Sequence, residues 1–309
     1  MHRPSHHDSA FVARAPRVAP LAPGPAPTLA RMSSVPRLSK ADAKAAYDAA
    51  QRVVQMHEKL AAWLRSGTTL AAIDGFVAQS LSEMHCRSCF KDYKVSGHPP
   101  FPSHACLSVN ECVVHGTAGY YRAPLKQGDV LKIDIGVFYK GWVGDAAWTY
   151  VFGEPSPTVA NLMKAGKESL KKGIAELRPG NPYLRWAEVV QDCVEVEHGV
   201  YCIENWGGHG YGRTLHGPPH ILNHRPLSGG SWPERGHLWH PGNLVAVEPM
   251  IAAGTGRTTQ RPFNSKLTDW PVFVADGSLS VHYEHDVLIT DDGQKVLTEG
   301  LEHLKDVIS

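Results

Sequence analysis

Residues 130–150 include two acidic residues where apolar side chains would be expected, and we interpret the stretch as two short strands joined by a tight turn at Lys140-Gly141. Asp134 lies inside the first apolar run, and Asp145 lies on the returning strand. A buried carboxylate is costly unless it is paired or binds a cation, and two that face each other also repel. These residues alone leave two interpretations open. Either a cation lies between the acids, or one acid is a turn residue and the other accepts backbone N–H groups.

Three more candidate ligands follow in the second half of the chain. The apolar stretch 244–250 carries Glu248, and the apolar stretch 281–290 carries Glu284. His209 lies within GGHGYG at 207–212, which is too glycine-rich for an ordinary strand, so we expect a turn whose backbone approaches a ligand closely. This stretch resembles a dinucleotide-binding motif only superficially, because no strand–turn–helix unit surrounds it.

Together these residues predict a centre with two metal ions. Oxygen-rich ligation with a single imidazole suits Mn, Fe, Co or Zn in a paired site better than it suits a structural zinc. Two such ions about 3.5–4 Å apart, bridged by carboxylates, would hold a hydroxide between them, which is hydrolase chemistry.

Composition limits the other classes of function. The chain has 309 residues, a net charge of +1 and no run of about 18 apolar residues, so neither a nucleic-acid-binding protein nor a membrane protein is expected. It shows no Sec-type signal, and its six cysteines lack the spacing of a disulfide framework, which is typical of a reducing compartment. Cys86 and Cys89 form a CxxC motif, but a zinc site needs about four ligands and no second pair is suitably placed.

Residues 1–38 differ in composition from the rest of the chain. The first 40 residues hold seven Pro, seven Ala, five Arg and one acid. Such a segment cannot bury a core, so we predict a disordered extension, followed by one domain over 39–309. An organelle address stays open as the alternative to a cytoplasmic protein, because the segment is Arg-rich and acid-poor.

The remaining sequence predicts a coarse structural repeat. Apolar spacing and capping residues indicate helices over about 40–64, 70–84, 156–177 and 181–198. Two helices therefore precede strands in each half, 40–150 and 156–290. The stretches 223–242 and 255–269 are interpreted as surface insertions.

The motifs resemble those of the type I methionine aminopeptidases, which have the pita-bread metallopeptidase fold. The matching segments, in the family's order and spacing, are SVNECVVHG (108–116), LKIDIGVFYKGWVGDAAWTY (131–150), GGHGYGRTLHGPP (207–219), VAVEPM (245–250) and SVHYEHDVLIT (280–290). The resemblance covers about residues 40–300. It implies an α+β fold of two pseudo-symmetric halves, with a central antiparallel sheet covered by helices.

The resemblance also implies a role for each motif residue. The ligands of two divalent ions (Co, Mn, Fe or Zn) would be Asp134, Asp145, His209, Glu248 and Glu284. Glu248 would also move the proton from the attacking water to the leaving amine, and His115 and His216 would contact the scissile amide and the developing oxyanion. Phe101, Cys106, Leu215 and Trp270 would join these two histidines in binding the substrate and would form an apolar slot for a thioether side chain.

The chain departs from the family pattern near the pocket. The loop before Phe101 reads GHPPFP, Leu215 replaces an aromatic residue, Gly217 replaces an acid, and Asp286 replaces a threonine. These changes bear on peptide preference and rate more than on metal binding.

The implied function is removal of the N-terminal methionine from nascent proteins and peptides by attack of a metal-activated hydroxide, with a preference for a small second residue. The alternatives are a proline-directed aminopeptidase on the same fold and a catalytically weak pita-bread binding module. The sequence gives no oligomer signal and leaves no amphipathic repeat unused, so a monomer that acts on N-terminal Met peptides and does not bind nucleic acid directly is expected. Association with the ribosome is an expectation from the substrate class, nascent chains.

Overall fold

The computed structural model describes residues 38–228 and 230–309. The proposed disordered extension, 1–38, lies outside the described residues except for its last position, so it stays a prediction. Within the described residues no helix has both the length and the apolar character needed to cross a membrane.

The helices lie close to where the sequence predicts them. The Ser39 hydroxyl caps the first by accepting a hydrogen bond from Asp42 N at 3.1 Å. A π-helical turn over Asp192–Glu197 extends the last. The helices are α1 (Lys40–Trp63), α2 (Leu70–Glu83), α3 (Pro157–Ile174) and α4 (Tyr183–Gln191), with short 3-10 turns at Pro233–Gly236 and Leu301–His303.

The strands of the described residues form four sheets. One five-stranded sheet has the order β1-β4-β5-β16, with β2 also paired to β4. The other five-stranded sheet has the order β15-β14-β9-β7-β8. The two three-stranded sheets have the orders β13-β10-β6 and β11-β12-β3. The strands are β1 (Arg87–Ser88), β2 (Cys106–Val109), β3 (Cys112–Val114), β4 (Val130–Tyr139), β5 (Trp142–Phe152), β6 (Tyr201–Cys202), β7 (Gly207–Gly210), β8 (Gly217–Leu222), β9 (Leu244–Val247), β10 (Met250–Ala252), β11 (Thr258–Pro262), β12 (Thr268–Val274), β13 (Ser280–His282), β14 (His285–Ile289), β15 (Gln294–Val296) and β16 (Val307–Ile308).

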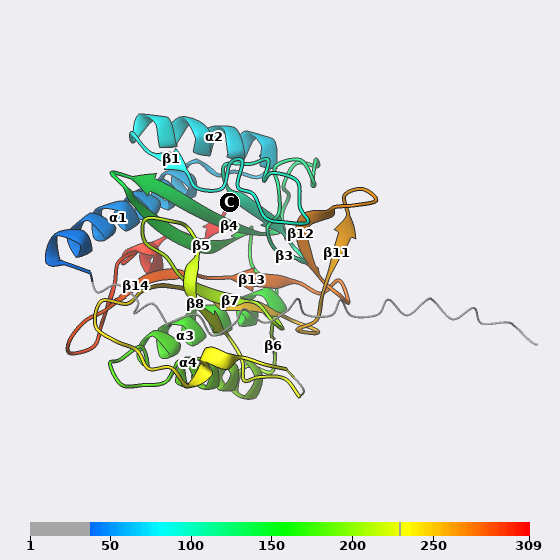
Figure 1. Cartoon of the computed structure of the whole chain (residues 1–309). Coiled ribbons are helices and arrows are strands. Elements are labelled where there is room, and N and C mark those ends of the chain that lie inside the picture. Colours follow the sequence, from blue (N-terminus) through cyan, green and yellow to red (C-terminus); the bar gives the residue numbers. More distant parts are fainter. Residues whose placement is uncertain (1–37, 229) are drawn as a thin grey trace, which may run out of the picture. The chain divides into compact units, whose positions relative to one another are not determined.

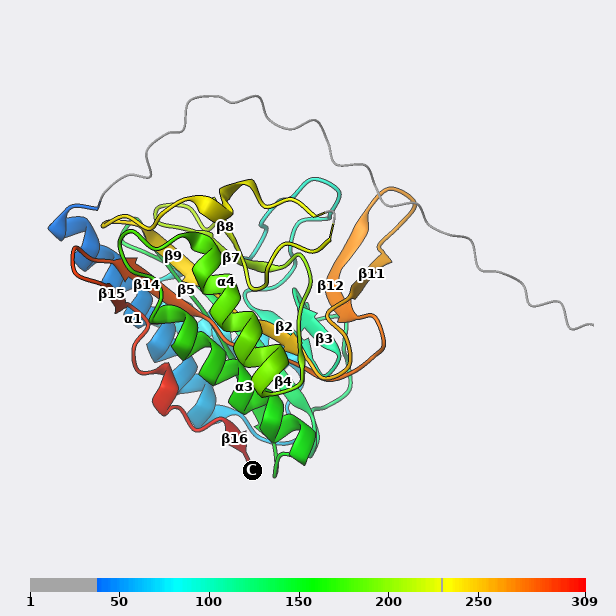
Figure 2. The same ribbon diagram turned by 90° about the horizontal axis from the view of Figure 1, so that it is seen from below.

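The helices lie outside the strands, as the expected pita-bread fold requires. Figure 1 places α2 at the top of the view and α3 and α4 at the bottom, with β4, β5, β13 and β14 between them. Figure 2 shows α3 and α4 side by side over one outer face. Helix α1 packs on β4 and β5, whereas α3 packs on β10 and β13. Each half of the chain thus contributes a helix pair and a mainly antiparallel sheet, which confirms the α+β fold class.

The β4–β5 hairpin separates the hydrophobic core from the acidic residues. Its strands have ten and eleven residues and are longer than expected. In the antiparallel register Ile133 pairs with Trp148, while Asp134 pairs with Ala147. Because side chains alternate across a strand, Ile133 and Trp148 share one face, and Asp134 and Asp145 share the other.

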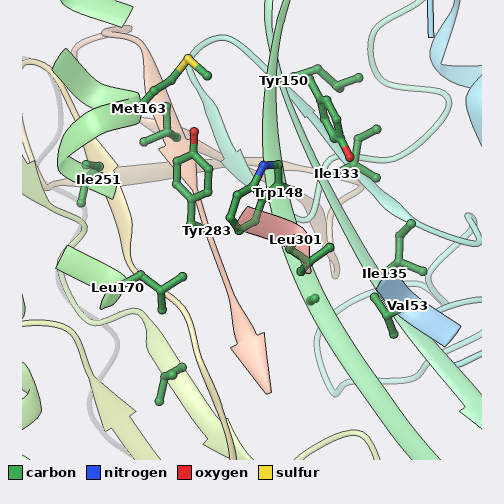
Figure 3. Packing of buried hydrophobic residues seen from close by; sticks show 14 of the residues in the cluster. Val53, Ile133, Ile135, Trp148, Tyr150, Met163, Leu170, Ile251, Tyr283 and Leu301 are labelled. Atoms are coloured by element: carbon green, nitrogen blue, oxygen red, sulfur yellow. The ribbon is translucent and has the colours of Figure 1, made fainter. Parts of the chain in front are cut away.

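The first of these faces packs into the main core. Figure 3 shows Val53 of α1 near Ile135 of β4, with Trp148 and Tyr283 close together farther along the cluster. The Trp148 and Tyr283 rings meet edge to face, with centroids 4.9 Å apart. Aromatic pairs of this geometry add stability beyond the apolar area they bury. The core therefore fixes the plane of the hairpin, and the two aspartates must point to its other side.

The glycine-rich segment at 207–210 is a strand, so our expectation of a turn was wrong. It forms β7, between β8 and β9, with His209 paired to Ala246. The reason is close backbone packing, because a Cβ at Gly208 would lie 2.1 Å from the Ala246 carbonyl oxygen. Glycine is therefore required here to let three strands approach each other. That approach places His209 beside β9, which ends next to Glu248, in the sheet whose strand β14 begins directly after Glu284.

The stretch 223–242 is only partly a surface insertion. Trp232 and Trp239 within it are almost fully buried, and the Trp239 ring lies 4.2 Å from that of Tyr183 on α4. The second stretch, 255–269, forms the mostly exposed β11 and the start of β12. The first stretch is therefore part of the packing beneath α4, which the sequence alone did not indicate.

Replacing Gly208 by Ala should destabilise the fold by about 1–3 kcal/mol or more, because the methyl group must displace backbone. Gly212→Ala is the matched control, since its Cβ would meet only Trp142 at an ordinary 3.6 Å. Urea unfolding of both variants measures the difference. Equal stability of the two variants would contradict the close strand packing.

Candidate metal centre

All eleven residues to which the sequence analysis assigned a role in the site surround one cavity of about 500 Å³. The two aspartates reach it from the β4–β5 hairpin, and His209 reaches it from β7. Glu248 lies between β9 and β10, and Glu284 lies between β13 and β14. A hydrogen bond from Glu284 N to Ala147 O at 2.9 Å joins the two sheets at this point. The lining includes the five expected ligands (Asp134, Asp145, His209, Glu248, Glu284), the two expected histidines (His115, His216) and the four expected pocket residues (Phe101, Cys106, Leu215, Trp270).

The ligand-type atoms converge closely. His209 Nε2 lies 3.9 Å from Asp145 Oδ2 and 3.6 Å from Glu248 Oε1. Ligand atoms of Asp145, His209 and Glu284 all lie within 4.8 Å of one another, which is close enough to share an ion. Asp134 adds a further negative charge beside Glu248.

The carboxylates are strongly destabilised in their ionised form. Burial raises the pKa of Asp134, Asp145, Glu248 and Glu284 well above their usual values, and the charges of neighbouring carboxylates raise each pKa further. No lysine or arginine is found among the residues that line the cavity. A cation is therefore needed if these groups are to be ionised together near neutral pH.

The residues fit two divalent ions. Asp134 Oδ1 and Asp145 Oδ1 are buried and have no hydrogen-bond partner, although most buried polar atoms are satisfied. Burial lowers the pKa of His209 to about 3, so its imidazole is neutral and able to act as a ligand. Unsatisfied carboxylate oxygens and one neutral imidazole are a suitable donor set for a pair of transition-metal ions.

The two further histidines also line the cavity. His115 adopts a left-handed backbone conformation with φ of 58°, and its ring meets the edges of Trp206 and Trp270 at 5.2 and 5.8 Å. A strained residue of this kind at a cavity wall is typical of a functional position. The His216 ring centroid is 4.4 Å from that of His209.

The four residues expected to form a thioether slot line the apolar part of the cavity. Phe101 and Trp270 meet edge to face at 5.2 Å, and Trp270 Nε1 donates to Pro99 O at 2.7 Å. Cys106 pairs with Asp134 across β2 and β4, so its side chain lies beside the acidic cluster. The His98 ring stacks on that of Trp270, with centroids 4.6 Å apart. The unusual loop before Phe101 thus supports one wall of the slot.

Sequence reasoning missed two residues. His282 Nε2 lies 3.2 Å from Glu248 Oε2, and its position two residues before Glu284 on an extended segment could have indicated that both side chains share a face. Tyr93 Oη lies 2.6 Å from His216 Nδ1. No sequence signal could have found this second contact, because it joins a loop to a strand end 123 residues away.

The family departures at Asp286 and Gly217 have different surroundings. Asp286 does not line the cavity. Its Oδ2 accepts a hydrogen bond from Asp145 N at 2.8 Å, so Asp286 fixes the backbone of the expected metal ligand Asp145 from outside the cavity. Gly217 does line the cavity, and a Cβ there would meet only Gly210 O at 3.7 Å. The missing acid therefore leaves room at the rim.

A separate group of ligand-type residues lies on α3 and the π-helical turn, away from the cavity. It consists of Glu168, Cys193, Glu197 and His198. Lys164 and Lys172 already pair with the two glutamates. This group is therefore an ion-pair network between two helical segments.

Comparison with known proteins agrees with the geometry. A profile described as metallopeptidase family M24 matches residues 44–291, which is most of the chain. The chain belongs to metallopeptidase family M24. This confirms the resemblance noted in the sequence, and family M24 membership accounts for the carboxylate-rich cavity.

The curated relatives described next are both named methionine aminopeptidases. The chain is 33% identical over 251 residues to methionine aminopeptidase 1 of Bacillus subtilis, covering 81% of this chain and 94% of the relative. It is 34% identical over 245 residues to the methionine aminopeptidase of Clostridium acetobutylicum, covering 79% and 90%.

Solved structures show the same fold. A methionine aminopeptidase from Thermotoga maritima superposes with a TM-score of 0.75 at 29% identity, covering 85% of this chain and 99% of that one. A prolidase from Pyrococcus furiosus gives a TM-score of 0.63 at 18% identity, with 86% and 63% covered, which shows the fold alone.

The raised carboxyl pKa values predict how metal binding depends on pH. In the metal-free protein these groups favour the folded state at low pH, and that contribution is lost as the pH rises through their raised folded-state pKa values. Metal ions bind the deprotonated groups and compensate for this loss. The increase in Tm on adding Mn²⁺ should therefore grow between about pH 6 and about pH 8.

Thermal unfolding with and without Mn²⁺ at each pH measures this increase. Asp145→Asn is the control, because it removes one of the coupled charges and should flatten the dependence. If Mn²⁺ raised the Tm of the unchanged protein equally at both pH values, metal binding would not depend on deprotonation of these carboxyl groups, which would contradict the prediction.

Proposed function

We propose that this protein is a methionine aminopeptidase that removes the N-terminal methionine from peptides and nascent proteins. The observation that carries the proposal is the convergence of Asp134, Asp145, His209, Glu248 and Glu284 on one cavity beside an apolar slot. The names of its family M24 relatives support the same activity.

These five residues would hold two divalent ions of Co, Mn, Fe or Zn. When bound, the ions would supply Lewis-acid polarisation of the scissile carbonyl and would lower the pKa of a water molecule. The chain's own residues must then position the peptide, move one proton and stabilise the developing oxyanion.

Glu248 is placed to move the proton. Its carboxylate lines the cavity, and burial raises its pKa, so it can accept a proton from water and later release it to the leaving amine. Its neighbours keep it in place, because Asn223 Nδ2 donates to Glu248 O at 2.8 Å.

The two histidines are placed to donate hydrogen bonds to the substrate. Burial lowers the pKa of His115 to about 4 and also lowers that of His216, so both rings are neutral near pH 7. A neutral imidazole has one N–H to donate. For His216, a Tyr93 hydroxyl that donates to Nδ1 would leave the ring proton on Nε2, where it could donate to an oxyanion.

The slot explains the preference for methionine. Its wall combines Phe101, Trp270, Leu215 and the Cys106 thiol, all nearly buried. A thioether packs well against aromatic edges and a thiol, whereas a charged side chain would be left unpaired there. A small second residue is preferred because the same cavity must hold the scissile bond beside the acidic cluster.

A cytoplasmic monomer that meets nascent chains near the ribosome fits this substrate. The domain organisation, with an extension over 1–38 followed by one catalytic domain, is part of the same proposal. Deleting the extension is expected to leave turnover intact.

Peptide cleavage tests the function. With Mn²⁺ or Co²⁺ added, the protein should release the first residue of Met-Ala-Ser, release it much more slowly from Met-Lys-Ser, and leave Ala-Pro-Ser intact. Chromatographic separation of the products measures each rate. Asp134→Ala and Glu248→Ala are controls that should abolish both turnover and full metal stoichiometry.

The other results would distinguish the alternatives. Cleavage of Ala-Pro-Ser would assign the protein to the proline-directed enzymes. Bound metal without cleavage of any of the peptides would favour a binding module, and full activity of either control variant would contradict the metal centre itself.

A further inference from the structure

His282 lies behind the carboxylate that is expected to move the proton. It is 1% exposed and does not line the cavity, so it cannot touch a substrate. Its Nε2 lies 3.2 Å from Glu248 Oε2. The backbone of His282 is fixed on both sides by Thr149, whose hydroxyl donates to His282 O at 2.8 Å and accepts from His282 N at 3.0 Å.

The hydrogen-bond pattern assigns the proton on this ring. His282 Nδ1 is buried and has no partner, whereas Nε2 faces a carboxylate, which can only accept when it is ionised. A neutral ring therefore gains a hydrogen bond only with its proton on Nε2, and a charged ring carries a proton there in any case. With Glu248 ionised, the Nε2–H therefore donates to Glu248 Oε2 whether the ring is neutral or charged.

This contact gives the two oxygens of Glu248 different environments. Oε2 accepts from His282, while Oε1 lies 3.6 Å from His209 Nε2, on the ligand side. The hydrogen bond to Oε2 restricts rotation of the Glu248 carboxylate about its Cγ–Cδ bond. The other oxygen therefore keeps its direction toward the metal positions and the cavity.

We propose that His282 is a positioning residue for the metal centre: its Nε2–H holds Glu248 Oε2, so that Glu248 Oε1 points to the ions and to the attacking water. The proposal rests on the metal centre of the proposed function. It extends that centre by a second imidazole. His282 has a ligand-type atom within 4.8 Å of those of Glu248 and Glu284, and in this proposal it holds Glu248 instead of binding an ion.

The test uses the full chain with two amide substitutions. His282→Gln places an amide N–H near the original Nε2 position, whereas the shorter side chain of His282→Asn reaches only the Nδ1 position. Titration calorimetry with Mn²⁺ measures affinity and stoichiometry without any substrate. The Asn variant should bind Mn²⁺ about 10–100-fold more weakly, as is typical when an outer hydrogen-bond partner of a metal ligand is lost. The Gln variant should stay close to the unchanged protein.

Two further readouts separate positioning from general structural damage. At saturating Mn²⁺ the Asn variant should show a lower kcat for Met-Ala-Ser with an unchanged KM, because the apolar slot is intact. His198→Asn is the matched control, since His198 also pairs with a glutamate, Glu168 at 2.8 Å, but lies outside the cavity. It should leave Mn²⁺ affinity unchanged. If the Asn variant does not fold, His282→Leu removes the donor instead.

Three results would overturn the proposal. Unchanged Mn²⁺ affinity in both the Asn and the Leu variant would mean that the contact positions nothing. Equal loss in Asn and Gln variants, with a changed visible spectrum of the Co²⁺-loaded Gln variant, would make His282 a metal ligand. A rise in KM with unchanged kcat would place its effect on substrate binding. Failure of the unchanged protein to cleave peptides while it binds two Mn²⁺ would contradict the proposed function alone.

Discussion

Repulsion among buried carboxylates is the constraint on which the site depends. Asp134, Asp145, Glu248 and Glu284 all reach one cavity, and none is more than 9% exposed. Four such charges without a counter-ion would cost several kcal/mol each, so the folded chain either keeps protons on them or binds cations. The buried Lys132, on the same face of β4, does not relieve this repulsion, because it does not line the cavity and burial lowers its pKa to about 7. Its Nζ donates instead to Asn110 O at 2.6 Å.

The fold supplies the rigidity that this arrangement requires. One face of the β4–β5 hairpin is committed to the core through Trp148, so its aspartates have no alternative orientation. The glycines of β7 let the second sheet close tightly, and that sheet brings one imidazole and two glutamates to the same space. Behind the ligands, Asp286 and His282 hold Asp145 and Glu248. Strain and buried charge are thus concentrated where metal ions would relieve them.

Much of this could be predicted from the sequence, for identifiable reasons. Helix caps such as Ser39 and acids within apolar strands such as Asp134 are local signals, and the ordered motifs carry the family resemblance. Interactions between distant segments left no such signal. Gly208 looked like a turn residue because its close neighbour, Ala246, lies 38 residues away. Trp239 looked like part of a surface insertion because its partner on α4 cannot be seen in the sequence, and the contact between Tyr93 and His216 was missed for the same reason.

Anomalous diffraction from crystals grown with Mn²⁺ tests the central claim most directly, because it locates ions without reference to activity. The account predicts two peaks in the cavity, about 3.5–4 Å apart, bounded by the five ligands. It also predicts no peak at the ion-pair network around Glu168 and Cys193. An empty cavity at neutral pH, or a single ion bound only by His209 and one carboxylate, would contradict the claim that paired cations neutralise the buried acids.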